Sequence, residues 1–300
     1  MGDCYGALEV DLSNEKHLDD VFRVALGRCL IKTQKNQQAL EMLENVTAGY
    51  VSQQKTLYTV QAYEQLGEIS KALEILSSQE TSDPTLQLML AKLLLGKEEY
   101  TQARDVLRPL LKHKRSNRGY IPSAGEVDPA EVRWLLAEGA VNRGLIDGAK
   151  QMWWNIWIYN PTSKFSKKAV IQLIKYGENV PNPNTEQGIK YIRERAVTLS
   201  KMYMYKEALV LTSLLEKKEG NHYSKKRAYD NFKAKNYPVC AEIFDNLSEL
   251  TGEDLYHHAL ATARAGNYNK SREIYKKLYT KYPTHKRAST ASYKIGYMFY

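Results

Sequence analysis

The sequence predicts an all-α protein, a right-handed superhelical solenoid of antiparallel helix pairs. Three observations predict this fold. Small residues recur at a fixed spacing, apolar residues recur with the period of a helix, and no long alternating strand pattern is bounded by turns. We therefore expect well over half of the residues in helices and almost none in strands. A chain of 300 residues is ordinary for a solenoid, in which each repeat packs only on its neighbours.

The repeat consists of a small residue, a second small residue 12 positions later, and a large apolar residue four positions after that. Two antiparallel helices joined by a short turn need small side chains where they approach most closely, which explains the spacing. In chain order the three positions hold Gly27, Ala39 and Leu43; Val60, Ala72 and Leu76; Ala91, Ala103 and Leu107; Ala137, Ala149 and Trp153; Ala196, Ala208 and Thr212; Ala228, Cys240 and Phe244; Ala259, Ser271 and Tyr275; and Gly296 begins an eighth unit.

Glycine and proline stand where each predicted pair needs a turn or an end. Gly67, Gly144 and Gly266 each lie five residues before the second small residue, where a tight turn joins the two helices. Pro161 and Pro283 each follow that residue by 12 positions. They are expected to end the second helix, because proline cannot continue one.

The second small residues are separated by 33, 31, 46, 59, 32 and 31 positions. Four of these steps are close to the length of a tetratricopeptide repeat, which the chain therefore resembles. The two long steps contain a polar loop at 115–129, and an extra helix at about 164–176 before a second loop at 177–188. We accordingly divide the chain into tetratricopeptide-like repeats at 1–114, the loop at 115–129, and further superhelical repeats at 130–300.

Charge is distributed unevenly along the chain. Residues 1–100 hold 9 Lys and Arg against 15 Asp and Glu, whereas residues 101–300 hold 34 against 19. The basic part can meet an anionic partner or can be a solvated face. No nucleic-acid-binding motif accompanies it, so no nucleic-acid partner is predicted. No apolar run is long enough for a transmembrane segment, and residues 1–12 do not look like a secretory signal.

The sequence predicts no catalytic residue, no cofactor and no metal site. Its six histidines have no metal-ligand spacing, and the neighbours His257 and His258 point in different directions on a helix. A glycine-rich phosphate loop and a Gly-x-Ser-x-Gly motif are both absent from the sequence. The three cysteines suggest neither a disulfide framework nor a zinc site. Cys29 and Cys240 are expected to be buried and inert, and Cys4 lacks the apolar segment that would precede a lipid anchor.

Weak candidates for contact with a glycan or a protein partner come from aromatic and basic clusters. Trp153 and Trp157 fall on the predicted core face of their helix. Trp154 lies off that face and is the better candidate for an exposed contact, because aromatic rings can stack on sugars. The complete set of candidate contact residues is Trp154, Arg193, Arg195, Lys225, Lys226 and Arg227.

Residues 130–169 resemble a unit of the superhelical region of bacterial soluble lytic murein transglycosylases. There a helix with a small-residue turn precedes an aromatic-rich helix and a segment like YNPTS at 159–163. The order downstream is also similar, with MYKEAL at 204–209 and YHHALA at 256–261. The resemblance covers residues 130–300 well and residues 1–114 only as generic repeats.

The resemblance implies a periplasmic protein whose helical region carries a C-terminal lysozyme-like domain that cleaves the glycan of peptidoglycan. The Glu-Ser and Gly-Leu-Met-Gln motifs of that domain do not occur in this sequence, so no catalytic residue can be carried over. Because the sequence stops inside a predicted helix near Tyr300, we expect a truncated chain with the enzyme beyond it. Whether the parent protein is an enzyme is left open.

Two functions are weighed. The first is a non-catalytic helical-repeat scaffold of a peptidoglycan lytic transglycosylase, which positions glycan strands or partners on a basic inner face. The second is a stand-alone tetratricopeptide adaptor of the cell envelope that binds a protein or peptide in its concave groove. The partner, the oligomeric state and the curvature of the superhelix do not follow from the sequence.

Overall fold

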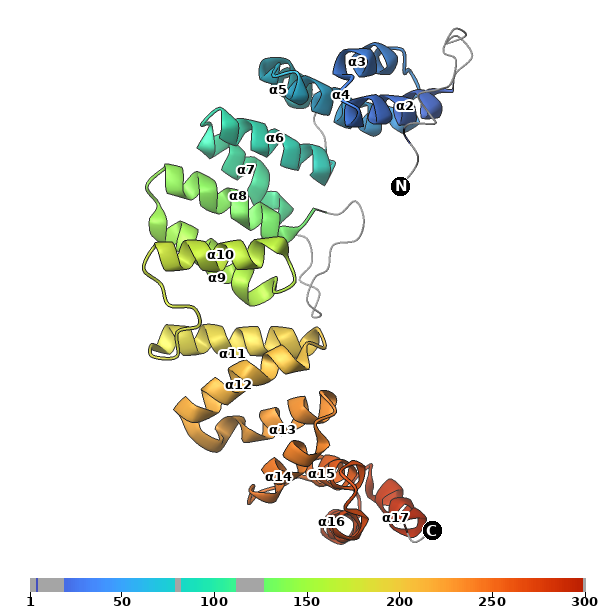
Figure 1. The fold of residues 1–300 in the computed structure, drawn as a ribbon, viewed down its shortest axis with the longest axis vertical. Helices are drawn as coiled ribbons and strands as arrows, with labels where there is room; N and C mark the ends of the chain where they lie inside the picture. The colour runs from blue at the N-terminus through green and yellow to red at the C-terminus, as the bar shows by residue number, and fades with distance from the viewer. Residues whose placement is uncertain (1–3, 5–18, 79–81, 112–126, 299–300) are drawn as a thin grey trace. The chain divides into compact units, whose positions relative to one another are not determined.

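The computed structural model describes residue 4 and residues 19–78, 82–111 and 127–298 (Figure 1). Every regular element in this part of the chain is a helix, which confirms the predicted all-α class. None of the described helices is long and apolar enough to cross a membrane. The described chain forms two compact units, one up to Met152 and one from Trp153 onward, so the boundary falls inside a helix.

The first unit consists of successive antiparallel helix pairs, drawn from blue to green in Figure 1. A 3-10 helix at Gly49–Val51 precedes the second pair. The helices are α2 (Asp20–Lys32) with α3 (Asn36–Glu44), α4 (Ser52–Gln65) with α5 (Ile69–Ser78), α6 (Pro84–Gly96) with α7 (Tyr100–Leu110), and α8 (Pro129–Asn142) with the first part of α9 (Ile146–Tyr159).

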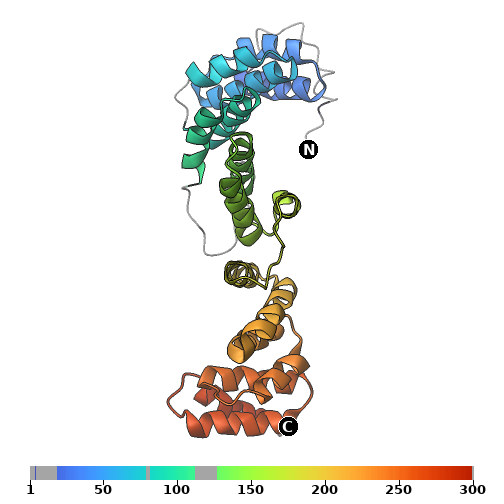
Figure 2. The same ribbon diagram turned by 90° about the vertical axis from the view of Figure 1, so that its left-hand side faces the viewer.

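The second unit begins with the end of α9 and the extra helix α10 (Lys164–Lys175), which the sequence predicted at about 164–176. The helices near the C-terminus lie side by side (Figure 2). Three further pairs and a last helix follow α10. They are α11 (Glu186–Lys201) with α12 (Tyr205–Glu219), α13 (Ser224–Lys233) with α14 (Tyr237–Asp245), α15 (Gly252–Arg264) with α16 (Tyr268–Lys281), and finally α17 (Ala288–Tyr297), with a 3-10 helix at Gly220–Tyr223.

The repeat positions form the core of both units, as predicted. All seven second small residues, from Ala39 to Ser271, are 0% exposed, and the residues four positions later are at most 2% exposed. At Gly27 a Cβ atom would lie 2.9 Å from the Leu43 side chain, so the close approach requires glycine there. The hydroxyl of Ser271 donates a hydrogen bond to the Ala259 carbonyl at 2.7 Å, which satisfies the polar group at a crossing point.

The turn between paired helices has one backbone conformation throughout. Gly67, Gly144 and Gly266 adopt φ values of +77°, +74° and +91°, in the left-handed region that glycine favours. The equivalent position of every other complete pair also has positive φ but carries a larger side chain. These residues are Gln34, Glu98, Tyr203 and Lys235. The left-handed turn therefore belongs to the repeat itself, and glycine marks only some of its occurrences.

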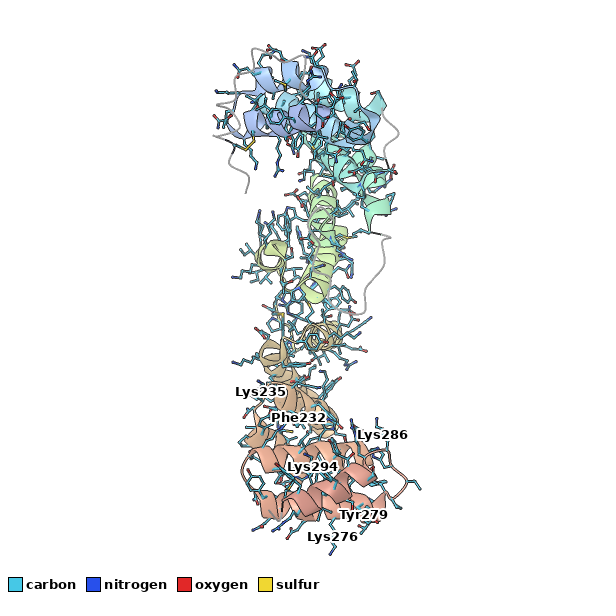
Figure 3. The ribbon with its side chains drawn as sticks, turned by 90° about the vertical axis from the view of Figure 1, so that its right-hand side faces the viewer. Phe232, Lys235, Lys276, Tyr279, Lys286 and Lys294 are labelled. Carbon is cyan, nitrogen blue, oxygen red and sulfur yellow. A yellow bond between two sulfur atoms is a disulfide. The ribbon has the colours of Figure 1, made fainter. Side chains whose placement is uncertain are left out.

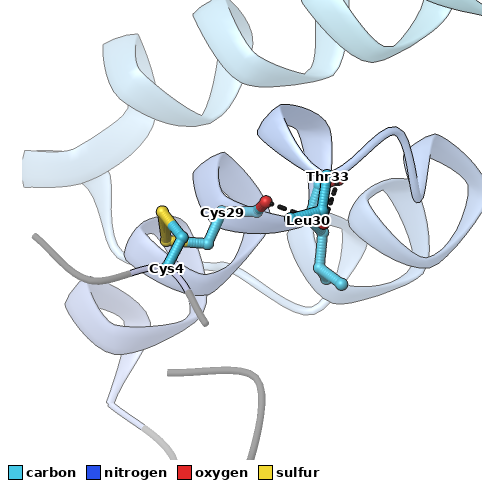
Figure 4. Close-up of a disulfide and its surroundings, with 4 residues drawn as sticks. All are labelled: Cys4, Cys29, Leu30 and Thr33. Carbon is cyan, nitrogen blue, oxygen red and sulfur yellow. Dashed lines mark hydrogen bonds between the residues drawn. A yellow bond between two sulfur atoms is a disulfide. The ribbon is translucent and has the colours of Figure 1, made fainter. Parts of the chain in front are cut away.

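The prediction that Cys29 is buried and inert was wrong, because Cys29 is only partly buried and forms a disulfide. Cys4 and Cys29 form a disulfide, with Cα atoms 5.1 Å apart (Figure 4). The sequence did not indicate this bond because the pairing depends on bringing together residues that are 25 positions apart. Cys240 is buried, as expected, and burial raises the pKa of its thiol to about 12. α9 and α16 end just before Pro161 and Pro283, which confirms their role as helix stops.

Candidate interaction surface

The tryptophans of α9 are core residues. Trp153 and Trp157 are buried as predicted, but Trp154 is also only 5% exposed, which contradicts its proposed role as an exposed contact. Trp153 stacks on Tyr176 at the end of α10, with ring centroids 5.4 Å apart. Trp154 packs on Tyr191 of α11 at 4.7 Å. The prediction failed because two further helices cover the end of α9, so a side chain off the repeat face is buried too.

Arg195 is also held inside the second unit. Its guanidinium donates a hydrogen bond to the Trp157 carbonyl and lies 4.5 Å from the centroid of that indole ring. Burial lowers the pKa of Arg195 to about 10. The side chain therefore joins α11 to α9.

Arg193 forms a two-point contact with α12. One of its terminal nitrogens lies 3.1 and 3.2 Å from the two carboxylate oxygens of Glu219. The hydrogen bond with Glu219 raises the pKa of Arg193. The guanidinium also lies 5.7 Å from the centroid of the Tyr223 ring. Nearly half of the Arg193 side chain remains exposed to solvent beside this contact.

The basic run at 225–227 is neutralised by three different carboxylates. Lys225 lies 3.1 Å from Asp254 of α15. Lys226 lies 2.8 Å from Asp230 of its own helix and donates to the Ser200 hydroxyl of α11. Arg227 lies 2.6 Å from Glu216 of α12. The run that looks like one cationic patch in the sequence therefore connects α13 to the three helices around it.

The first helices of the last pairs share a polar and aromatic network that the sequence analysis missed. Asp254 accepts hydrogen bonds from the Thr251 amide and hydroxyl and from the Tyr229 hydroxyl, each at 2.8 Å. Burial alone would raise the pKa of Asp254, but the hydrogen bonds from Thr251, Tyr229 and Lys225 lower it overall. Burial and the contact with Asp254 raise the pKa of Tyr229.

His257 lies among aromatic rings in the same network. Its ring is 5.0 Å from that of Tyr229 and 5.1 Å from that of Phe232, edge to face in both cases. The carboxylate of Glu253, one turn earlier on α15, lies 3.6 Å from the His257 ring nitrogen Nδ1. The carboxylate of Glu253 also lies 3.8 Å from Arg287, in the segment before α17. The network thus runs from α13 across α15 to the start of the last helix.

Three exposed cations form a row in the repeat register of the first helices. Lys201, Lys233 and Arg264 are the basic residues of the last turn of α11, α13 and α15, and all three are exposed. Each stands five positions after the first small residue of its repeat, so the repeat register places them at equivalent points. Arg264 also covers the rings of Phe232 and Tyr237, at 5.2 and 5.0 Å. The row could have been predicted from the sequence, because its three residues stand at the same distance from the first small residue of each repeat.

Two small pockets lie in the described part of the chain. One pocket of about 200 Å³ lies among α12, α13 and α14 and includes the Arg227–Glu216 ion pair. Another, of about 280 Å³ in the first unit, lies between α4 and α6 and includes Leu57 and Lys92. Both are below the usual size of a drug-sized ligand site. Within the described ranges no three His, Cys, Asp or Glu side chains are grouped as metal ligands would be.

The repeat geometry decides the fold family. The fold is tetratricopeptide-like. No protein-family model matches the sequence, and no curated protein matches it significantly.

Solved structures give a distant likeness. One is a tetratricopeptide repeat protein from Parabacteroides merdae, 11% identical over 94% of this chain and 99% of that chain, with a TM-score of 0.38. Another is a chain of the APC/C hetero-tetramer Cut9-Hcn1, 12% identical over 95% of this chain and 64% of that chain, with a TM-score of 0.43. A third is the TPR2AB domain of yeast Sti1 in its pHSP90 complex, 12% identical over 94% of this chain and 98% of that chain, with a TM-score of 0.33. At these scores the fold assignment depends on the helix pairs described above. The resemblance to lytic transglycosylases finds no support in these matches and stays a prediction.

Proposed function

We propose that this protein is an interaction scaffold that binds an extended acidic segment of a partner protein along α11, α13 and α15. The observation that carries the proposal is the row of Lys201, Lys233 and Arg264 at equivalent positions of three successive pairs. Cations in the last turn also stabilise a helix through its dipole. The dipole effect requires no particular position within the last turn. The three cations, in contrast, all stand five positions after the first small residue of their repeat.

The spacing of the row suits an extended chain. Packed helices lie roughly 8–10 Å apart, and an extended chain advances about 3.3 Å per residue. An acidic side chain at every third residue of such a segment would therefore meet successive cations. The half-buried rings of Tyr229 and Tyr256 lie on the same first helices and supply apolar surface beside the charges.

Peptide selection tests this proposal. Twelve-residue peptides would be selected from a random library on the full chain, and their affinities measured for Lys201→Glu with Lys233→Glu. We expect acidic peptides and an affinity loss of about a hundredfold, since reversing two charges both removes attraction and adds repulsion. The matched control is Lys217→Glu with Lys277→Glu, which reverses two exposed lysines of second helices. Selection of peptides without acidic residues, or equal losses in both variants, would contradict the proposal.

A peptidoglycan scaffold in the periplasm is the second candidate. The Cys4–Cys29 disulfide favours an oxidising compartment, and the resemblance of residues 130–300 points to the cell wall. The burial of Trp154 removes one of the side chains expected to touch glycan. Co-sedimentation with purified peptidoglycan at low salt tests this candidate. Salt-sensitive binding that Lys201→Glu with Lys233→Glu abolishes would support it, and an unbound chain would dismiss it.

A further inference from the structure

The extra helix α10 exposes a narrow stripe of isoleucine and lysine. Ile171 and Ile174 are 63% and 57% exposed, far more than isoleucine usually is in a folded protein. The remaining residues of the stripe are exposed lysines. They are Lys164, Lys167, Lys168 and Lys175.

All six side chains fall within one side of the helix. At about 100° per residue, they occupy an arc of about 120°. Ile171 and Ile174 lie toward one edge of the arc, with Lys167 between them. Lys164, Lys168 and Lys175 lie toward the other edge. The stripe is therefore divided lengthwise into an apolar edge and a cationic edge.

The opposite side of α10 packs against the rest of the second unit. Phe165, Ala169 and Leu173 are buried, and Tyr176 at the helix end stacks on Trp153. This wide apolar face is thus already used in packing, and the orientation of the stripe is set by it. The stripe forms no part of the row of cations on α11, α13 and α15.

The stripe carries positive charge without acidic residues beside it in the sequence. Residues 161–177 contain these four lysines and no Asp or Glu. The ammonium groups of Lys164 and Lys168 lie 5.2 and 5.5 Å from the centroid of the Phe165 ring. That of Lys175 lies 5.7 Å from the Tyr176 ring. Aromatic rings therefore restrict the cationic edge, which reduces the entropy lost when a partner binds.

We propose that α10 is a second docking site, which binds an acidic amphipathic helix of a partner protein. Apolar residues of that helix pack on Ile171 and Ile174, and its carboxylates reach the lysines of the cationic edge. The stripe is about 17 Å long, the length of about three helical turns in the partner. A partner helix with one apolar edge and one acidic edge matches both edges of the stripe at once.

Charge complementarity and the divided stripe select this occupant over a membrane or a nucleic acid. Helices that bind a membrane surface bury a wide apolar face in the lipid, but the wide face of α10 is packed against the protein. A nucleic-acid backbone would use the lysines and leave the isoleucine edge in water. An acidic amphipathic helix uses both edges.

Binding of designed peptides to the full chain tests the proposal. The probe is a labelled 15-residue helical peptide with leucine along one face and glutamate along the other. The comparison peptide has the same composition in scrambled order. Fluorescence anisotropy should show at least tenfold tighter binding of the amphipathic peptide, since only this peptide presents continuous apolar and acidic edges.

Paired variants locate the site. Ile171→Ser with Ile174→Ser should weaken the amphipathic peptide about tenfold, equivalent to about 1.4 kcal/mol. Lys164→Gln with Lys175→Gln should weaken it about fivefold. The controls are Val210→Ser, an aliphatic side chain that is 64% exposed on α12, and Lys276→Gln with Lys277→Gln on α16. Figure 3 shows Lys276 well apart from Phe232 of α13.

The controls should change binding less than twofold, and circular dichroism should show the same helix content in every variant. Three results would overturn the proposal: no preference for the amphipathic peptide, equal losses in stripe and control variants, or binding to vesicles with 30% phosphatidylserine that depends on the stripe while peptide binding does not. Lys201→Glu with Lys233→Glu should leave peptide binding to α10 unchanged, which separates this site from the proposed row on α11, α13 and α15.

Discussion

The guanidinium of Arg195 lies 4.5 Å from the centre of the Trp157 ring and donates a hydrogen bond to the carbonyl of the same residue. Arg195, a candidate for partner contact from the sequence, is thus held in an internal contact with a tryptophan that the sequence placed in the core. It links α11 to α9 within the second unit. A cluster of aromatic and basic residues therefore stabilises the fold where the sequence suggested a binding surface.

Arg195 should contribute more to stability than Arg193. Replacing Arg195 with alanine removes a charge-assisted hydrogen bond and a contact with an aromatic face, and leaves the Trp157 carbonyl without its donor. We expect a loss of about 2–3 kcal/mol. Arg193→Ala removes a half-exposed ion pair and should cost less than about 1 kcal/mol. Urea unfolding followed by tryptophan fluorescence measures both, and equal effects would contradict the internal role of Arg195.

Asp254 should stabilise the protein in a pH-dependent way. Hydrogen bonds hold its pKa in the folded protein below the ordinary value of 3.8 despite burial. Its contribution is therefore present above about pH 4, and is lost as pH falls through the lower folded-state pKa. Asp254→Asn, which weakens the contacts with Thr251, Tyr229 and Lys225, should cost about 2 kcal/mol at pH 7.

Urea unfolding midpoints of the wild type and of Asp254→Asn, measured at pH 7 and pH 3, check the predicted pH dependence of this contribution. The difference in unfolding free energy between the two proteins should narrow at pH 3, because the unfolded chain takes up a proton at Asp254 below its ordinary pKa of 3.8 more readily than the folded protein does. A gap of constant size would show that the charge of Asp254 does not matter.

The disulfide should stabilise the first unit. Closing a loop across 25 positions contributes about 3 kcal/mol by restricting the unfolded chain. Dithiothreitol should lower the melting temperature of the wild type and of Cys240→Ala, but not that of Cys29→Ser. Thiol titration of the denatured, unreduced chain should find one free thiol. Three free thiols would rule out the bond.

Glycine substitutions should have opposite effects within one helix pair. Gly144 has a φ of +74°, so Gly144→Ala should destabilise the protein by about 1 kcal/mol. Gly148 lies in the helix α9, and nothing stands within 4 Å of an added Cβ atom. Gly148→Ala should therefore stabilise by about 0.5 kcal/mol. Thermal unfolding measures the melting temperature of both variants. A Gly144→Ala variant at least as stable as the wild type would contradict the strain expected at this turn.

The repeat register predicted the fold because it records local packing. The small residues at 12-residue spacing identified the helix pairs, and Gly67, Gly144 and Gly266 identified three of the turns. The remaining turns could not be recognised because residues such as Tyr203 and Lys235 adopt the same backbone conformation without glycine. Helix packing imposes this conformation on side chains that do not favour it.

The candidate site was harder to predict because its contacts join residues from different repeats. The partners of Lys225 and Arg227 lie on α15 and α12, and only the packing of these helices brings the charges together. Trp154 was misplaced because α10 and α11 cover a side of α9 that an ordinary repeat would expose. The row of Lys201, Lys233 and Arg264 could have been found, since it follows the same register as the small residues.

The most direct test of the scaffold is the affinity of a selected acidic peptide for Lys201→Glu with Lys233→Glu, measured beside Lys217→Glu with Lys277→Glu. Both variants change the net charge equally, so nonspecific electrostatic attraction falls by the same amount in each. A loss of about a hundredfold in the first variant, with less than a threefold loss in the second, is the result expected for binding along the first helices. Equal losses in the two variants would show that the peptide responds only to net charge, and would contradict the proposed binding surface.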